Sequence, residues 1–230
     1  MKGNNMPQFD YILAFAIAFI VAFFMTPLVR KLAFQIGAVD VPKDERRMHK
    51  EPVARLGGLA IFIGFLVSIG YYLINNFIDT GSLKLDIRFQ GILIGSLMII
   101  AIGIIDDIKP LRPWIKLLVQ VIAALTVVMT GTQIEEITNP FSSYGMTSLG
   151  MLSIPLTVIW IIGITNAINL IDGLDGLAAG VSSIALLSLL FISIFEQQYG
   201  VVYVVAALAG GTLGFLPFNF NPAKIFMGDS

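Results

Sequence analysis

Long apolar runs separated by short polar connections make up most of the chain. A membrane-spanning helix needs about 20 consecutive, mostly apolar residues. Seven runs meet this criterion, so residues 1–230 are predicted to form one all-α polytopic membrane domain with about seven transmembrane helices. The predicted spans are 11–29, 56–75, 89–105, 114–131, 151–168, 177–195 and 201–218.

The longest polar connection between late spans, 132–150, reads "TQIEEITNPFSSYGMTSLG". Apolar and polar residues alternate near Ile134 and Ile137, and turn-forming residues follow. This pattern predicts a small β-hairpin lying on the membrane surface.

Composition agrees with a membrane protein. Hydrophobic residues make up 57% of the chain and charged residues only 13%, whereas about a quarter of a typical soluble domain is charged. The chain contains no cysteine, which excludes disulfides and thiol chemistry. The first ten residues, "MKGNNMPQFD", lack the basic region and cleavage site of a signal peptide, so the first span is expected to stay in the membrane.

Lysine and arginine residues predict the orientation. The side with Lys2, Lys84 and Arg88 carries few of them, whereas the connections after spans 1, 3, 5 and 7 carry the rest. By the positive-inside rule, the richer side is cytoplasmic and the N-terminus is outside. The cytoplasmic set comprises Arg30, Lys31, Lys43, Arg46, Arg47, Lys50, Arg55, Lys109, Arg112, Lys116 and Lys224.

Acidic residues at the ends of three spans fall on this same side. Asp106 and Asp107 end span 3, Asp172 and Asp175 follow span 5, and Asp229 follows span 7. The topology was drawn from basic residues alone, so the gathering of the carboxylates at one face is an independent result.

The motif "IGIIDDIKPLRPWIK" contains the first acidic pair. Adjacent carboxylates at a membrane boundary repel each other and lose hydration, so Asp106 and Asp107 need a cation or strong donors. Mg²⁺ suits them as a hard ion that prefers oxygen ligands. The alternative is an interfacial acid pair balanced by Lys109, Arg112 and Lys116.

The motif "NAINLIDGLDGLAAG" contains the second pair. If the helix continues, Asn166, Asn169 and Asp172 lie along one face. The neighbouring glycines would let the backbone approach a ligand, and a helix beginning near Leu174 would point free N–H groups at a phosphate. The alternative is that the aspartates cap the next helix, which accounts for one Asp but not for Asp175 and the two asparagines as well.

The motif "NFNPAKIFMGDS" brings a third polar group. Asn219, Asn221 and Asp229 are polar, Phe226 is a candidate stacking surface for a base, and Lys224 is a candidate phosphate partner. The alternative is an ordinary polar tail after a membrane helix.

The stretch "VPKDERRMHKEPVARLGGLAIF" is the most charged part of the chain. It contains the single histidine, His49, and leads through Arg55 into span 2. A basic segment beside a membrane is typical of a topology determinant or an anionic-lipid contact; the alternative is recruitment of an anionic substrate. Together the four stretches favour phosphoryl chemistry on a polyanionic substrate, with a lipid as one reactant.

These four motifs, in this order, resemble the polyprenyl-phosphate N-acetylhexosamine-1-phosphate transferases. The family includes the undecaprenyl-phosphate GlcNAc-1-phosphate transferases and the phospho-MurNAc-pentapeptide translocase. The match runs from about Asp40 to Ser230. It implies a bacterial inner-membrane enzyme with a cytoplasmic active site. With Mg²⁺, or alternatively Mn²⁺, the enzyme would transfer a sugar-1-phosphate from a UDP-sugar to undecaprenyl phosphate and release UMP.

The resemblance also implies roles for individual residues. Asp229 would bind the metal, together with Asp107 and Asp172, and Asp106 would be the base that deprotonates the lipid phosphate. Lys116 would lie near the phosphates, and direct attack is favoured over an enzyme-bound intermediate. The implied substrate-binding residues are His49, Arg55, Asn166, Asn169, Asp172, Asp175, Asn219 and Phe226.

The chain departs from the family at its end. Members have about ten or eleven spans and a histidine-rich cytoplasmic loop after span 9, so this sequence, which stops at "GDS", is predicted to be C-terminally truncated. "VARLGG" and "LIDGLDG" favour transfer of GlcNAc-1-phosphate, with phospho-MurNAc-pentapeptide as the alternative. An inactive fragment or an ion-coupled transporter are further alternatives, although transporters place ionisable groups near the midplane rather than at span ends. No nucleic-acid partner is expected, and a homodimer remains open.

Overall fold

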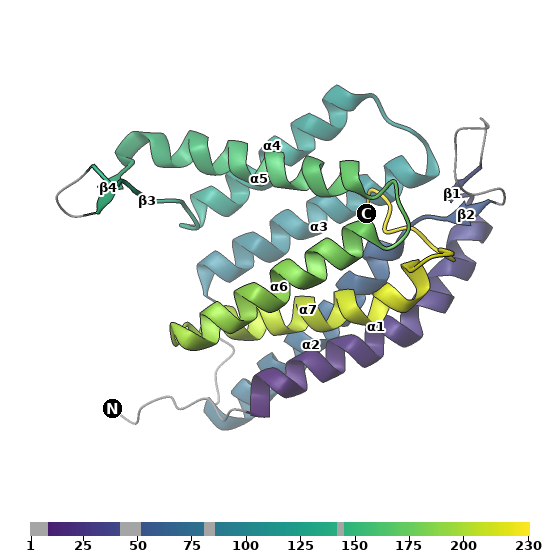
Figure 1. Ribbon diagram of the computed structural model, residues 1–230, viewed down its shortest axis with the longest axis horizontal. Helices are drawn as coiled ribbons and strands as arrows, with labels where there is room; N and C mark the ends of the chain where they lie inside the picture. The colour runs from purple at the N-terminus through teal and green to yellow at the C-terminus, as the bar shows by residue number, and fades with distance from the viewer. Residues whose placement is uncertain (1–8, 42–51, 81–85, 142–144) are drawn as a thin grey trace.

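The computed structural model describes residues 9–41, 52–80, 86–141 and 145–230, and Figure 1 shows how the elements are arranged. Within these ranges the chain forms seven α-helices, one short 3₁₀ helix and two two-stranded sheets. The helices are α1 (Phe9–Ile36), α2 (Gly57–Thr80), α3 (Ile87–Ile108), α4 (Pro113–Met129), α5 (Ser153–Ile171), α6 (Leu177–Phe195), α7 (Tyr199–Asn219) and η1 (Gly150–Leu152). The strands are β1 (Val39–Asp40), β2 (Val53–Ala54), β3 (Glu136–Thr138) and β4 (Met146–Ser148).

The helices confirm the predicted all-α polytopic class. In the described ranges, 6 helices are long and apolar enough to cross a membrane, and α4 is apolar but shorter, with 17 residues. The predicted end of the first span at residue 29 is too early for the helix itself. The helix α1 continues through Arg30 and Lys31 and ends at Ile36, before Gly37 with φ +82°. A glycine in this left-handed conformation is a common helix terminator.

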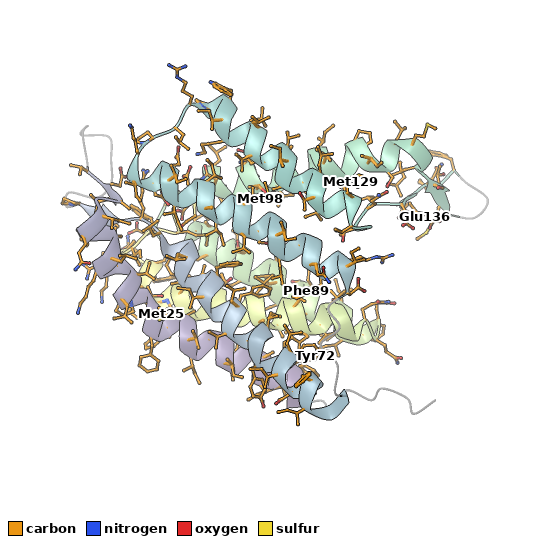
Figure 2. All side chains as sticks on the ribbon, turned by 180° about the vertical axis from the view of Figure 1, so that it is seen from behind. Met25, Tyr72, Phe89, Met98, Met129 and Glu136 are labelled. Carbon is orange, nitrogen blue, oxygen red and sulfur yellow. The ribbon has the colours of Figure 1, made fainter. Side chains whose placement is uncertain are left out.

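The predicted hairpin within 132–150 is present. Strands β3 and β4 pair antiparallel, with Glu136 opposite Ser148 and Thr138 opposite Met146. All residues of both strands are exposed. Glu136 marks the hairpin in Figure 2, where it lies at the end of the molecule away from β1 and β2.

The predicted gathering of the acidic motifs at one end of the bundle is confirmed. The α3–α4 connection, the α5–α6 connection, the β1–β2 pair and residues 220–230 all lie at the same end in Figure 1. Hydrogen bonds from Gly228 to Asp172 and from Asp229 to Asp107 connect three of these segments directly.

Small residues let α1, α2 and α7 approach closely. The fully buried Ala14, Ala18 and Ala22 recur at every fourth position of α1. On α7, Gly210 and Gly214 are also four residues apart, and an added Cβ on either would collide with a backbone carbonyl of α1. In lipid, where apolar burial gives no net drive for helix association, such small-residue interfaces favour packing through backbone proximity.

This packing continues toward the end of the helices that lies away from β1 and β2, in a buried cluster that also contains Ala14 and Ala18. Tyr72 on α2 and Phe89 on α3, both labelled in Figure 2, pack against this cluster, which includes Phe65 and Tyr203. The rings of Tyr72 and Tyr203 have centroids 4.3 Å apart. The three-helix unit of α1, α2 and α7 is therefore packed along its length.

Gly214→Leu is expected to destabilise the helix bundle, because its Cβ would meet the backbone carbonyl of Phe19, which cannot move aside cheaply. Overpacking of this kind costs about 1–3 kcal/mol. The measurement is thermal unfolding in detergent micelles. Gly163→Leu on α5 is the matched control, since a Cβ there meets nothing within 4 Å; equal losses of stability in the two variants would contradict the small-residue interface.

Single cysteines at Pro110, Gly173 and Lys224 are expected to react with a membrane-impermeant thiol reagent from the cytoplasmic side only. The native chain contains no cysteine, and all three positions are exposed at the same end of the bundle. The measurement is reagent labelling in intact cells against labelling in inverted vesicles. Labelling of any one position from outside would contradict the orientation.

Candidate active site

The extended residues 225–229, called here the docked segment, form the centre of the site. Its backbone lies against the start of α2, where Gly57 N–H donates to the carbonyl of Phe226 at 3.0 Å and Gly58 N–H donates to the carbonyl of Met227 at 2.8 Å. The first N–H groups of a helix have no partner within the helix. The docked segment therefore satisfies donors that α2 leaves free.

Strand β2, just before α2, holds the same segment as well. The carbonyl of Ala54 accepts a hydrogen bond of 2.8 Å from Phe226 N–H, and Ala54 forms a parallel bridge with Ile225. Sequence reasoning interpreted "VARLGG" as a basic entry to a span and as a sign of the transferred sugar, and it missed this docking role. The neighbouring pair of glycines was the available signal, since residues without side chains let two backbones approach.

Two of the predicted carboxylates bind the backbone of the docked segment. Asp172 Oδ2 accepts from Gly228 N–H at 2.8 Å, and both oxygens of Asp107 accept from Asp229 N–H at 3.1 Å. Gly228 has φ +78°, and an added Cβ would lie 2.6 Å from Asp107 Oδ2. Only glycine fits this position without strain.

The side chain of Asp229 is bound by groups from two further helices. Its Oδ1 accepts from Asn169 Nδ2 at 2.8 Å, and its Oδ2 accepts from Lys116 Nζ. Lys116 Nζ also donates to Asp106 Oδ2 at 3.2 Å, while Asp106 Oδ1 accepts from Leu111 N–H at 2.7 Å. One ammonium group thus bridges carboxylates that are more than a hundred residues apart in sequence.

The pKa values of Asp172 and Asp229, which both lie outside the membrane helices, are shifted in opposite directions. Burial raises the pKa of Asp172 to about 6, against the lowering effects of backbone hydrogen bonds from the docked segment and of the nearby charge of Arg55. Burial also acts to raise the pKa of Asp229, but hydrogen bonds from groups that include Lys116 and Asn169 outweigh it, so the pKa is lowered. Asp229 is therefore ionised at neutral pH.

The residues fit a hard cation that binds together with substrate. Asp172 Oδ1 is buried without a hydrogen-bond partner, and carboxylate oxygens are the donors that Mg²⁺ prefers. Among the described residues, however, no three Asp, Glu or His side chains are close enough to hold a metal ion by themselves. The predicted set of Asp107, Asp172 and Asp229 is therefore not a preformed cage. Mg²⁺ commonly binds through one or two carboxylates and substrate phosphates, which this arrangement allows.

Asn166 lies one helical turn before Asn169, which binds Asp229. Its amide Nδ2 donates to Gln120 Oε1 at 2.8 Å, and Gln120 Nε2 donates back to Asn166 Oδ1 at 3.3 Å. Asn166 therefore contacts α4 rather than Asp229. Sequence reasoning missed Gln120, although a lone amide inside an apolar run is a recognisable signal of a functional or structural contact.

Two other predicted residues hold the backbone that leads into the docked segment. Asp175 Oδ2 accepts from Asn221 Nδ2 and from Ala223 N–H, both at 3.0 Å. Asn219 is fully buried, and its Nδ2 donates to the carbonyl of Ile225 at 3.0 Å. Both side chains fix the turn after α7, and their contact with a substrate stays a prediction.

The remaining predicted residues have different surroundings. Phe226 is buried, with only 7% of its surface exposed. Stacking of a base on Phe226 stays a prediction, and it requires that the base can reach the face of the ring. Arg55 forms an ion pair of 3.3 Å with Asp40, next to the carboxylate cluster. His49 lies outside the described residues.

Residues 89–230 match the model of a known family, glycosyl transferase family 4. The chain belongs to this family. The matched range contains Asp106, Asp107, Lys116, Asp172 and Asp229, and so it covers the carboxylate cluster described above.

Curated relatives agree with this membership. The chain is 40% identical over 219 residues to a probable undecaprenyl-phosphate N-acetylglucosaminyl 1-phosphate transferase of Bacillus subtilis (strain 168), which covers 95% of this chain and 58% of the relative. It is 37% identical over 244 residues to a decaprenyl-phosphate N-acetylglucosaminephosphotransferase of Mycobacterium tuberculosis, which covers 100% of this chain and 58% of the relative.

A phospho-N-acetylmuramoyl-pentapeptide-transferase of Streptococcus thermophilus is 30% identical over 206 residues, 85% of this chain and 59% of the relative. This family 4 chain thus spans 58% of the length of the two relatives named for N-acetylglucosamine.

In this family 4 chain, Asp175→Ala is expected to loosen the turn that Asp175 holds, because Asn221 and Ala223 N–H lose their acceptor. Hydrogen bonds to a charged group contribute about 1–3 kcal/mol. Limited trypsin digestion should therefore cut several-fold faster after the exposed Lys224. Asp175→Asn keeps an acceptor oxygen and is the control; equal cleavage rates in wild type and Asp175→Ala would contradict the role.

Proposed function

We propose that this protein transfers N-acetylglucosamine-1-phosphate from UDP-GlcNAc to undecaprenyl phosphate at the cytoplasmic face of the bacterial plasma membrane and releases UMP. The product would be the lipid-linked sugar pyrophosphate that begins a cell-envelope glycopolymer. One observation carries the proposal. Carboxylates from α3, from the α5–α6 connection and from the docked segment gather with Lys116 at one end of the membrane helices.

The choice of sugar is supported by the relatives. The two that match most of this chain at 37–40% identity are named for N-acetylglucosamine and a polyprenyl phosphate. The relative named for phospho-N-acetylmuramoyl-pentapeptide is 30% identical over a smaller share of the chain. The names of these relatives therefore favour GlcNAc-1-phosphate as the transferred group.

The location of the cluster suits the two reactants. A polyprenyl phosphate keeps its chain in the bilayer and its phosphate at the surface, whereas a nucleotide sugar arrives from water. The cluster lies where α3 and α5 end. In a membrane-spanning bundle this would be the boundary between these two environments. A site there can bring both phosphate groups together while the lipid stays in the membrane.

The chemistry is a phosphoryl transfer. An oxygen of the lipid phosphate attacks the sugar-linked phosphorus of UDP-GlcNAc, the bond between this phosphorus and the bridging oxygen breaks, and UMP leaves with that oxygen. Asp106 would accept the proton of the lipid phosphate, once Lys116 turns from the carboxyl group of Asp106 to a phosphate oxygen. Asn169 and Lys116 orient Asp229.

Magnesium is the proposed cofactor, with Asp229 and the partnerless Oδ1 of Asp172 as its protein ligands. When bound, the ion would offset the negative charge of the pyrophosphate and orient it. The proposal for Asp229 also agrees with its lowered pKa, since a metal ligand must be deprotonated.

In the complete protein, Asp229→Asn is expected to lower UMP release from UDP-GlcNAc by at least about 100-fold, because it removes a charged ligand whose loss costs several kcal/mol of transition-state stabilisation. The measurement is UMP formation with added undecaprenyl phosphate and Mg²⁺.

Asp86→Asn is the matched control. Asp86 caps α3 at the far end from the site, and asparagine caps equally well. Undiminished turnover in Asp229→Asn would remove Asp229 from the site. Solute uptake by reconstituted liposomes without any UMP formation would instead favour a transporter.

A further inference from the structure

Gln120 and Asn166 form a reciprocal pair of amide hydrogen bonds between α4 and α5. Asn166 donates to Gln120 at 2.8 Å and Gln120 donates to Asn166 at 3.3 Å, so each side chain is both donor and acceptor. Gln120 is only 8% exposed. A buried amide and a second amide that satisfy each other in this way fix how far apart the two helices lie. They also fix how far one helix is shifted along its axis relative to the other.

Among the described residues, few apolar side chains pack against α5, whereas most of α7 is buried. Among its described residues, the buried ones are Ser153 and Thr157, both in its first turns and therefore far from the site. The position of the other end of α5 thus depends on few contacts, of which the amide pair is one.

The early turns of α5 are attached by polar contacts to the residues that follow α4. Ser153 Oγ donates to Gln133 Oε1 at 3.0 Å, and Thr157 Oγ1 accepts from Ile134 N–H at 2.9 Å. Polar contacts therefore join α4 and its following residues to α5 at both ends. Between membrane helices such hydrogen bonds act as directional contacts where apolar burial gives no preference.

The amide pair lies one helical turn from two groups that bind Asp229. Lys116 precedes Gln120 by four residues on α4, and Asn169 follows Asn166 by three residues on α5. Residues three and four apart lie on the same face of a helix. Lys116 and Asn169 bind opposite oxygens of Asp229, so the distance between these two donors depends on how α4 and α5 are held.

We propose that the Gln120–Asn166 pair, called here the amide clasp, positions α4 and α5 so that Lys116 and Asn169 hold opposite oxygens of Asp229. The expected effect of the clasp on catalysis rests on the proposed function, whereas its effect on the position of Lys116 and Asn169 does not. Gln120 is a positioning residue that acts through Lys116, and Asn166 is a positioning residue that acts through Asn169. This assigns Asn166 a role other than direct contact with the nucleotide.

The first test measures the environment of Lys116 without any substrate. Gln120→Met and Asn166→Leu each remove one amide while keeping a similar volume, and the double variant removes both. Competitive acetylation of lysine amines, quantified by mass spectrometry, reports how firmly Lys116 is held, with the exposed Lys109 as the internal reference. Each single variant should raise the acetylation rate of Lys116 relative to Lys109 by about 5-fold or more, the factor expected for losing one hydrogen-bonded contact.

The double variant shows whether the two residues act as a pair. If they do, its acetylation rate equals that of either single variant, because the contact is already lost when one amide is removed. Multiplication of the two single effects would overturn the clasp, as would wild-type acetylation in both single variants. Either single variant suffices for the test if the other fails to fold.

The second test measures the reaction. In the complete protein, each single variant should lower kcat by about 10-fold, with KM for UDP-GlcNAc changed less than about 2-fold, since displacement of reacting groups affects the transition state more than nucleotide binding. Because unfolded protein would also expose Lys116 and lower the active fraction, acetylation and kcat are both measured on the monodisperse folded fraction from size-exclusion chromatography.

Thr126→Val on α4 is the matched control. Its hydroxyl bonds only the carbonyl of Ile122 within its own helix, so acetylation of Lys116 and kcat should both stay at wild-type values.

The two proposals fail separately. Raised Lys116 acetylation in the variants, with no UMP formed by the wild type, supports the clasp and overturns the proposed function. Normal UMP formation with unchanged Lys116 acetylation in the variants overturns the clasp alone.

Discussion

Two backbone hydrogen bonds determine where the site forms: Gly228 N–H to Asp172, and Asp229 N–H to Asp107. They fasten the docked segment to α3 and to the α5–α6 connection, while α2 and β2 hold its other side. The side chain of Asp229 is thereby directed to Lys116. Buried carboxylates without partners are costly, so the same contacts that position the segment also stabilise the acidic residues.

The molecule combines a closely packed unit with a lightly packed one, and the site lies between them. Helices α1, α2 and α7 approach through alanine and glycine, and the docked segment rests on the start of α2. On the other side, α5 is mostly exposed, and polar contacts join it to α4 and to the residues that follow α4. Asp229 belongs to the first unit, whereas Lys116 and Asn169 belong to the second. Any displacement of α5 therefore changes the surroundings of Asp229 directly.

Only one of the site's cations, Lys116, bonds directly to two of the carboxylates among the described residues. Its ammonium lies between the carboxylates of Asp106 and Asp229. A polyanionic substrate and a divalent ion would enter this balance together, since the phosphates attract the lysine and the carboxylates attract the ion. The membership in glycosyl transferase family 4 and the proposed phosphoryl transfer agree with such an arrangement.

The sequence by itself determined the spans, the hairpin at 132–150 and the gathering of the acidic motifs at one face. These features follow from local hydropathy and from the placement of Lys and Arg, which do not depend on distant neighbours. Only the tertiary structure decided that Asn166 binds Gln120, that Asp175 holds a turn and that Asp107 binds a backbone N–H. A carboxylate or an amide can form hydrogen bonds with many kinds of group, so a motif alone does not identify its partner. The fold decides the partner by bringing remote residues within hydrogen-bonding distance.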